Sequence, residues 1–105
     1  MFLNYKFMYK IVIPEYVMQD IFEIKDYIFR VSFSLETANK IYNEIMAHIM
    51  TLKIFPLMYP IFKWNLRVMT VRKKYRVFYK VNEEQKEVII YYIFGAEQDY
   101  YSLIH

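Results

Sequence analysis

Seven basic residues lie between positions 63 and 80 of the chain, with no acidic residue among them: Lys63, Arg67, Arg72, Lys73, Lys74, Arg76 and Lys80. Tyr75, Phe78 and Tyr79 alternate with them, and aromatic residues are frequent in strands. Lysine and arginine side chains on one surface attract phosphate groups and carboxylates. The segment therefore predicts a surface that binds a nucleic acid or an acidic protein, unless it is only the solvated face of a small basic domain.

The composition excludes several kinds of site. Cysteine is absent, which excludes disulfides, thiolate catalysis and cysteine-ligated zinc. The two histidines, His48 and His105, are too few for a multi-histidine metal site within one chain. Gly95 is the sole glycine, so the chain has no glycine-rich phosphate loop. We therefore expect no metal and no small-molecule cofactor.

Length and hydrophobicity predict one folded domain over residues 1–105. Hydrophobic residues make up 57% of the chain and aromatic residues 21%, which is ample for a core. This excess also suggests that a partner covers some apolar surface. No apolar run reaches the roughly 18–20 residues that cross a bilayer, and the N-terminus lacks the pattern of a signal peptide. We expect a cytoplasmic protein without membrane contact.

The elements that must position the basic residues begin with a strand and two helices. Residues 5–13 are rich in aromatic and β-branched side chains and predict a strand that ends at Pro14. Apolar residues spaced three and four apart predict a helix from Glu15 to about Arg30. Ser34 is a good N-cap for a second helix that ends before Pro56. A short link between the two helices predicts an antiparallel hairpin.

Three strands are predicted in the second half, at about 66–72, 75–81 and 87–94. The last is apolar on both faces in its middle, which is typical of a central strand. A short helical tail is expected at about 98–104. The predicted fold is α+β: an N-terminal strand and an antiparallel three-stranded meander form a sheet of about four strands, and the helical hairpin packs on one face. The other face would be a concave surface, lined partly by basic residues.

In this order of elements the sequence resembles the RelE/ParE superfamily of bacterial type II toxins. The segments that carry the resemblance are YKIVIPEYVMQDIFEIKDYI, the second-helix pattern S-x-E-T-A-x-K-I-Y, the loop IFPLMYP, RKKYRVFY and the ending EVIIYYIFGAEQDYYSLI. The resemblance implies a small toxin that a cognate antitoxin keeps inactive. It further implies one of two targets. The RelE branch cleaves mRNA on the ribosome without a metal, whereas the ParE branch shares the fold and inhibits DNA gyrase.

For a RelE-like ribonuclease, the resemblance implies a catalytic set and an RNA-binding set. The catalytic candidates are Arg72, Lys73, Lys74, Arg76 and Tyr100. The RNA-binding candidates are Lys63, Arg67 and Lys80. Cations would surround the phosphate while a base and an acid move protons. For Arg76, a structural role is at least as well supported, because arginine often forms packed ion pairs.

The sequence departs from the family pattern around its glycine. Many members have a histidine or tyrosine before this glycine and arginines after it, where this chain has Phe94 and the run Ala96–Gln98. A phenylalanine cannot exchange a proton, and Glu97 would repel a phosphate. The departure favours a ParE-like gyrase inhibitor without catalytic activity, or a member that retains only antitoxin binding, so these alternatives stand beside the ribonuclease.

Overall fold

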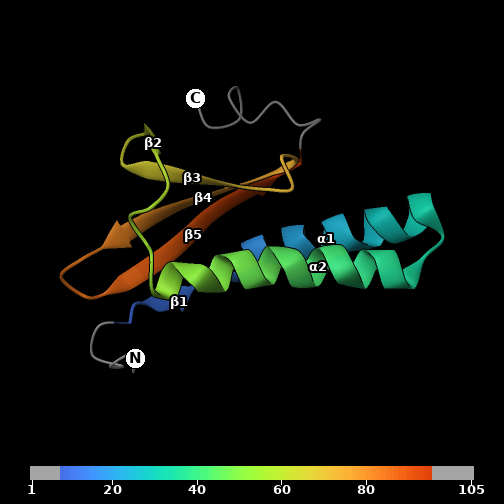
Figure 1. Ribbon diagram of the computed structural model, residues 1–105, viewed down its shortest axis with the longest axis horizontal. Coiled ribbons are helices and arrows are strands. Elements are labelled where there is room, and N and C mark those ends of the chain that lie inside the picture. The colour runs from blue at the N-terminus through green and yellow to red at the C-terminus, as the bar shows by residue number, and fades with distance from the viewer. Residues whose placement is uncertain (1–7, 96–105) are drawn as a thin grey trace.

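A five-stranded sheet and a helical hairpin make up the structure, a computed structural model that describes residues 8–95 (Figure 1). The strand order is β1-β5-β4-β3-β2. The strands are β1 (Lys10–Val12), β2 (Ile61–Lys63), β3 (Leu66–Val71), β4 (Tyr75–Asn82) and β5 (Glu87–Phe94). The helices are α1 (Glu15–Ser32) and α2 (Leu35–Met50), and a 3-10 turn follows at Thr51–Lys53. Both helices lie side by side against one face of the sheet (Figure 1).

The hairpin turns sharply between its two helices. Phe33 ends α1 in a left-handed conformation, with φ of 56°, and its N–H donates to Phe29 O over 2.8 Å. Ser34 then caps α2, since its Oγ accepts from the Thr37 N–H at 3.1 Å. This confirms Ser34 as the predicted N-cap. The first helix runs to Ser32, beyond the end expected at about Arg30, so only two residues separate the helices.

The main core lies between the hairpin and the sheet. The apolar stripes predicted for the two helices face it, with Val17, Ile21, Ala38, Ile45 and Ile49 fully buried. From the sheet, Met69, Val77, Tyr79, Val88 and Ile90 are fully buried against them. The predicted packing of the helical hairpin on one sheet face is therefore confirmed.

β5 lies inside the sheet, as its apolar pattern predicts. It pairs with β1 in parallel, with Lys10 beside Glu87 and Val12 beside Ile89, and with β4 in antiparallel orientation. The helices cover one face of β5 and aromatic side chains pack on the other, which accounts for its apolar residues on both faces. The α+β class and the order of the elements are thus confirmed.

The sheet has five strands rather than the four predicted, because Ile61–Lys63 forms an extra edge strand. Trp64 and Asn65 connect it to β3, and both have positive φ, 51° and 62°. Two consecutive residues with positive φ mark the tight turn that hairpins favour. Sequence reasoning missed it because such turns are usually recognised by Asn-Gly or Asp-Gly, and this turn has no glycine.

The sheet face opposite the helices is mainly aromatic. Leu66 and Phe78 are buried there, and Phe62, Val68, Tyr91, Tyr92 and Phe94 pack around them. Two of the basic candidates, Arg76 and Lys80, lie on this face, because they alternate along β4 with core residues. The face predicted to be lined partly by basic residues is therefore an aromatic surface with two cations. The predicted helical tail at 98–104 and the first residues of the predicted strand lie outside the described range.

Candidate functional site

The β3–β4 turn presents three of the basic candidates at one end of the sheet. Arg72 and Lys73 have φ of 57° and 56°, and the Lys74 N–H donates to Val71 O over 3.0 Å. Positive φ at both central residues of the turn from Val71 to Lys74 is typical of a type I′ turn. All three side chains are exposed, so the turn places three cations at the surface.

The three turn cations differ in what they contact. Arg72 Nε forms an ion pair with Glu44 of α2, which connects the turn to the second helix. Lys74 Nζ lies 5.8 Å from the ring centre of Tyr75, whose side chain is almost fully buried. Burial raises the pKa of the Tyr75 hydroxyl, and neighbouring Arg72 opposes this effect.

Arg76 and Lys80 occupy the aromatic face of β4, on either side of Phe78. Arg76 is half-buried, and its Nη1 atom is inaccessible to solvent and has no hydrogen-bond partner among the described residues. In the sheet it lies between Thr70 of β3 and Phe94 of β5. Lys80 Nζ lies 5.3 Å from the ring centre of Tyr91. Lys80 therefore lies beside an aromatic ring, and Arg76 lies beside Phe94 in the sheet.

Lys63 and Arg67 lie away from the turn, toward the other end of β3. Arg67 Nη1 donates to Tyr59 O at 2.7 Å and to Leu57 O at 3.3 Å, so it holds the loop that precedes β2. Lys63 Nζ lies 4.5 Å from the ring centre of Trp64. The seven basic residues thus lie in three separate places: the β3–β4 turn, the aromatic face of the sheet, and the end of β3 away from this turn. Tyr100 lies outside the described residues.

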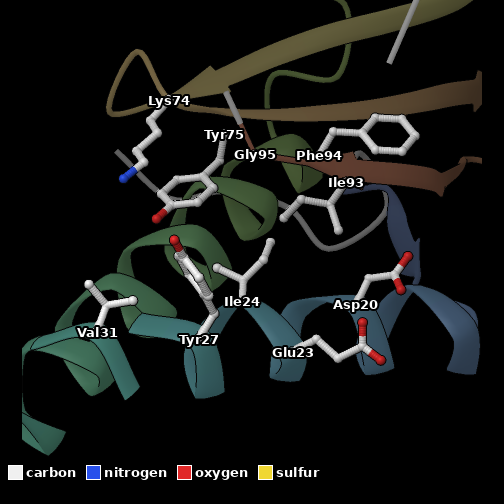
Figure 2. Close-up of a pocket in the computed structure, with 10 residues that line it drawn as sticks. All are labelled: Asp20, Glu23, Ile24, Tyr27, Val31, Lys74, Tyr75, Ile93, Phe94 and Gly95. Atoms are coloured by element: carbon white, nitrogen blue, oxygen red, sulfur yellow. The ribbon is translucent and has the colours of Figure 1, made fainter. Parts of the chain in front are cut away.

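A groove that sequence reasoning missed lies beside the turn (Figure 2). It has a volume of about 520 Å³ and runs between α1 and the ends of β4 and β5. Its lining residues are Asp20, Glu23, Ile24, Tyr27, Val31, Lys74, Tyr75, Ile93, Phe94 and Gly95. The sequence signal was present: Asp20, Ile24, Tyr27 and Val31 recur at helical spacing next to the buried stripe. That this second stripe faces a groove depends on where the ends of β4 and β5 lie, and this is known only from the structure.

The groove carries opposite charges at its two ends. Figure 2 shows the carboxylates of Asp20 and Glu23 at one end and the Lys74 ammonium group at the other, with apolar side chains between them. Desolvation raises the pKa of Asp20, and the negative charge of Glu23 raises it further. A cation placed between these two carboxylates would be attracted by both.

Other chemistries lack support within residues 8–95. No group of three or more acidic, histidine or cysteine side chains that could hold a metal occurs there. His48 is half-buried on α2, and its Nδ1 lies 2.8 Å from Glu44 O, as expected of a packed histidine. In the same range, no helix is both long and apolar enough to cross a membrane.

Over residues 11–100 the chain matches the family of the ParE toxin of the type II toxin–antitoxin system parDE. The chain belongs to the ParE toxin family. The predicted membership of the RelE/ParE superfamily is therefore confirmed, and the protein is a toxin of a type II toxin–antitoxin system. A search of curated proteins found no match.

Solved structures of this superfamily share the fold of this ParE-family toxin. A chain of the chromosomal ParDE toxin–antitoxin system from P. aeruginosa has a TM-score of 0.73 and 20% identity, covering 86% of this chain and 98% of that one. A chain of the toxin–antitoxin complex RelBE2 from Mycobacterium tuberculosis has a TM-score of 0.63 and 16% identity, covering 86% and 94%. The isolated E. coli RelE toxin has a TM-score of 0.54 and 14% identity, covering 91% and 94%.

Proposed function

We propose that this ParE-family toxin acts in the cytoplasm by binding and inhibiting DNA gyrase, without catalysis. The observation that carries the proposal is the environment of Phe94. Its ring lies 6.0 Å from Phe78 and 5.8 Å from Tyr92, measured between ring centres. Many members of the superfamily have a histidine or tyrosine at this position, and a phenylalanine inside an aromatic cluster cannot donate or accept a proton. Membership of the ParE family supports the same target.

We further propose that a cognate antitoxin neutralises the toxin. The ParDE and RelBE2 structures are of toxin–antitoxin systems, which supports a protein partner of this kind. Exposed apolar side chains also favour a partner that covers them: Phe33 is 88% exposed, Val31 62% and Met58 61%. Large apolar side chains are seldom this exposed to solvent on a protein that has no binding partner.

Gyrase inhibition can be tested with the purified full-length toxin in a DNA supercoiling assay. Supercoiling should fall as the toxin concentration rises, and an equimolar amount of the cognate antitoxin should restore it. In cells, induction of the toxin should stop DNA synthesis before protein synthesis. Full supercoiling at toxin concentrations that exceed those of gyrase would refute the proposal.

A second candidate function is ribosome-dependent cleavage of mRNA, favoured by the exposed cations of the β3–β4 turn. In that reaction the ribose 2′-hydroxyl gives its proton to a base and attacks the adjacent phosphate, and the bond from phosphorus to the 5′-oxygen breaks as that oxygen takes a proton from an acid. Cations stabilise the negative charge that builds up on the phosphate. Arg72, Lys73, Lys74 and Arg76 would supply the positive charge, Tyr100 would move a proton, and Lys63, Arg67 and Lys80 would bind the RNA. A translation-coupled cleavage assay tests this: wild-type cutting that Lys73→Ala and Lys74→Ala leave intact would refute this site.

A further inference from the structure

Large apolar side chains are exposed along the loop that joins the 3-10 turn to the edge strand β2 (Figure 1). The members of this loop patch have exposed fractions between 39% and 61%: Ile54, Phe55, Leu57, Met58 and Ile61. Ile61 pairs with Arg67 of β3, and the neighbours of Arg67 in that strand pack on the aromatic face. Because side chains alternate along a strand, Ile61 and Arg67 lie on the opposite face, on the side of the helices. The loop patch therefore borders the helix side of the sheet, at the edge that β2 forms.

The fold holds the backbone of this loop through three of its carbonyl groups. The buried Tyr79 hydroxyl donates to Pro56 O over 2.8 Å. Arg67 Nη1 donates to Leu57 O at 3.3 Å and to Tyr59 O at 2.7 Å. Surface loops more often leave such carbonyls to water and are mobile. Here side chains of the sheet fix the loop backbone, while the apolar side chains of the loop remain in solvent.

A loop that is held in this way needs little rearrangement to bind a partner. Association costs conformational entropy when loops and side chains become ordered at an interface. Because hydrogen bonds from the sheet already fix this backbone, only the side chains lose freedom on binding. Phe55 and Met58, the two most exposed members of the patch, are of residue types that are enriched at protein interfaces. The loop patch thus has the composition and the fixed backbone of a protein-binding surface.

The orientation of the side chains and the charge around them define the partner that fits. Exposed side chains that project from a loop fit a hollow in a folded protein, whereas a single helix or strand binds in a groove or at a sheet edge. Lys53 precedes the loop, Arg67 lies beneath it, and residues 45–82 contain no aspartate or glutamate. This part of the chain is therefore positively charged, and carboxylates on a partner would be attracted to it.

A second copy of the chain and a lipid surface fit the loop patch less well. Two copies related by a twofold axis present the same patch to each other, which would bring Lys53 and Arg67 of both copies together. Like charges weaken an interface, and residues 45–82 supply no carboxylate to offset them. Anionic lipids are recognised by clusters of about four to eight lysines and arginines, more than the patch has beside it.

We propose that the loop patch is the surface with which this toxin binds its target protein, and that the target presents an apolar hollow bordered by carboxylates. The identity of this target as gyrase rests on the proposed function. The patch lies at the end of β3 away from the β3–β4 turn, so it is separate from the turn cations and from the groove beside them. The target therefore contacts a surface that none of the basic turn residues belongs to.

The test measures binding of the full-length toxin to purified gyrase. Phe55→Ala together with Met58→Ala should weaken binding at least tenfold and raise the toxin concentration that halves supercoiling by the same factor. The matched control is Phe33→Ala together with Leu35→Ala at the interhelical link, which also removes one aromatic and one aliphatic side chain. Those two side chains are 88% and 57% exposed, so the control removes at least as much exposed apolar surface. A tenfold loss in both double variants, or in neither, overturns the proposal.

Two charges at one position test the carboxylates of the target. Met58→Glu and Met58→Lys both replace the same 61% exposed side chain by a charged one, so they lose the same apolar contact. Met58→Glu should weaken gyrase binding at least tenfold more than Met58→Lys, because only glutamate is repelled by carboxylates. Equal weakening, or a larger effect of lysine, overturns the proposal. These single variants also decide the matter if thermal unfolding shows that the double variant does not fold.

Growth arrest on induction separates this proposal from the identity of the target. A wild type that arrests growth and leaves gyrase fully active refutes gyrase inhibition, and growth arrest then tests the loop patch by itself. Arrest that the Phe55 and Met58 double variant loses and the control retains supports the patch as the target surface. Arrest by both double variants overturns it. A wild type that neither inhibits gyrase nor arrests growth overturns both proposals.

Three further results would assign the loop patch to another occupant. Self-association in sedimentation that Met58→Glu abolishes would assign it to a second copy of the chain. Binding to phosphatidylglycerol vesicles that the same variant abolishes would assign it to a membrane. A tenfold loss of affinity for the cognate antitoxin in the Phe55 and Met58 double variant, but not in the control, would assign it to the antitoxin. Each of these results overturns the proposal.

Discussion

Arg72 in the β3–β4 turn forms an ion pair with Glu44 of α2, so a residue that could contact a target phosphate is already held by the fold. The pair joins the sheet to the second helix at the end of the molecule where Lys73 and Lys74 are exposed. Because Glu44 neutralises Arg72, the free positive charge of the turn resides on the two lysines. The charge available to a target can therefore be removed at either lysine without breaking the Arg72–Glu44 ion pair.

The Arg72–Glu44 pair should contribute little to stability. Its side chains are 40% and 34% exposed, and pairs exposed to this degree are worth about 0–1 kcal/mol. A double-mutant cycle with Arg72→Ala and Glu44→Ala, measured by urea unfolding, should give a coupling energy below about 1 kcal/mol. The Asp26–Arg30 pair, at 3.2 Å and with both side chains 66% exposed, is the control and should couple still more weakly. Coupling above about 2 kcal/mol would contradict this assignment.

Lys73→Gly should stabilise the protein while removing a positive charge. Lys73 has φ of 56°, which disfavours any residue with a Cβ by about 1–2 kcal/mol, whereas glycine's greater freedom in the unfolded chain costs about 0.5–1 kcal/mol. The net gain should be about 0.5–1 kcal/mol in urea unfolding. Lys73→Ala is the control, because it removes the same charge and keeps the strained φ. An alanine variant as stable as the glycine variant would show that the turn is not strained.

Tyr79→Phe should destabilise the protein by about 1–2 kcal/mol at neutral pH. The Tyr79 hydroxyl is buried and donates to Pro56 O over 2.8 Å, so its removal leaves that carbonyl unpaired. Free energies of unfolding from urea titrations measure the effect. Tyr27→Phe, on a half-exposed ring, is the control and should change stability little.

The same substitution should alter the response to alkali. Burial raises the pKa of Tyr79 from 10.0 to about 12. Because the folded pKa exceeds the unfolded one, this tyrosine stabilises the protein fully below pH 10, and that contribution is lost as the pH rises toward 12. Wild type and Tyr79→Phe should therefore converge in stability above pH 10. A difference that stays constant from pH 8 to 12 would contradict the raised pKa.

Asp20→Asn should stabilise the unbound toxin slightly at pH 7. Desolvation and Glu23 raise the pKa of Asp20, so the folded protein binds this proton more tightly than the unfolded chain does. Stability then falls as the pH rises through the range between the ordinary and the raised pKa, and asparagine removes this loss. Thermal unfolding should show the gain at pH 7 and none at pH 3. Asp26→Asn, which breaks an ion pair with Arg30, should give no such gain.

The helices and the inner strands were predicted well from the sequence, because the spacing of their apolar side chains shows which faces are buried. The stripes through Val17 and Ile45 have helical spacing, and the run at 88–90 is apolar on both faces, so each pattern had one reasonable interpretation. The strand at Ile61–Lys63 was missed because three residues carry too little pattern, and its turn uses Trp64 and Asn65 in place of glycine.

The site was less predictable, because basic residues close in sequence separate in space. Residues 72–74 lie on a turn, Arg76 and Lys80 lie on the aromatic face, and Arg67 binds loop carbonyls. The sequence shows that the segment is basic. The alternation of side chains along β4 and the conformation of the β3–β4 turn decide where each cation lies. The groove depends on how α1 lies relative to the ends of β4 and β5, which no local pattern specifies.

The parallel pairing of β1 with β5 has a kinetic consequence. The helical hairpin and the β3–β4–β5 meander each form from neighbouring residues, but Lys10 meets Glu87 only after nearly the whole chain has been brought together. Because loop-closure entropy opposes such distant contacts, they slow folding more than local contacts do. We therefore expect two locally assembled halves that join late through this short pairing. Shortening or mispairing β1 should slow the closing step and leave the hairpin and the meander able to form.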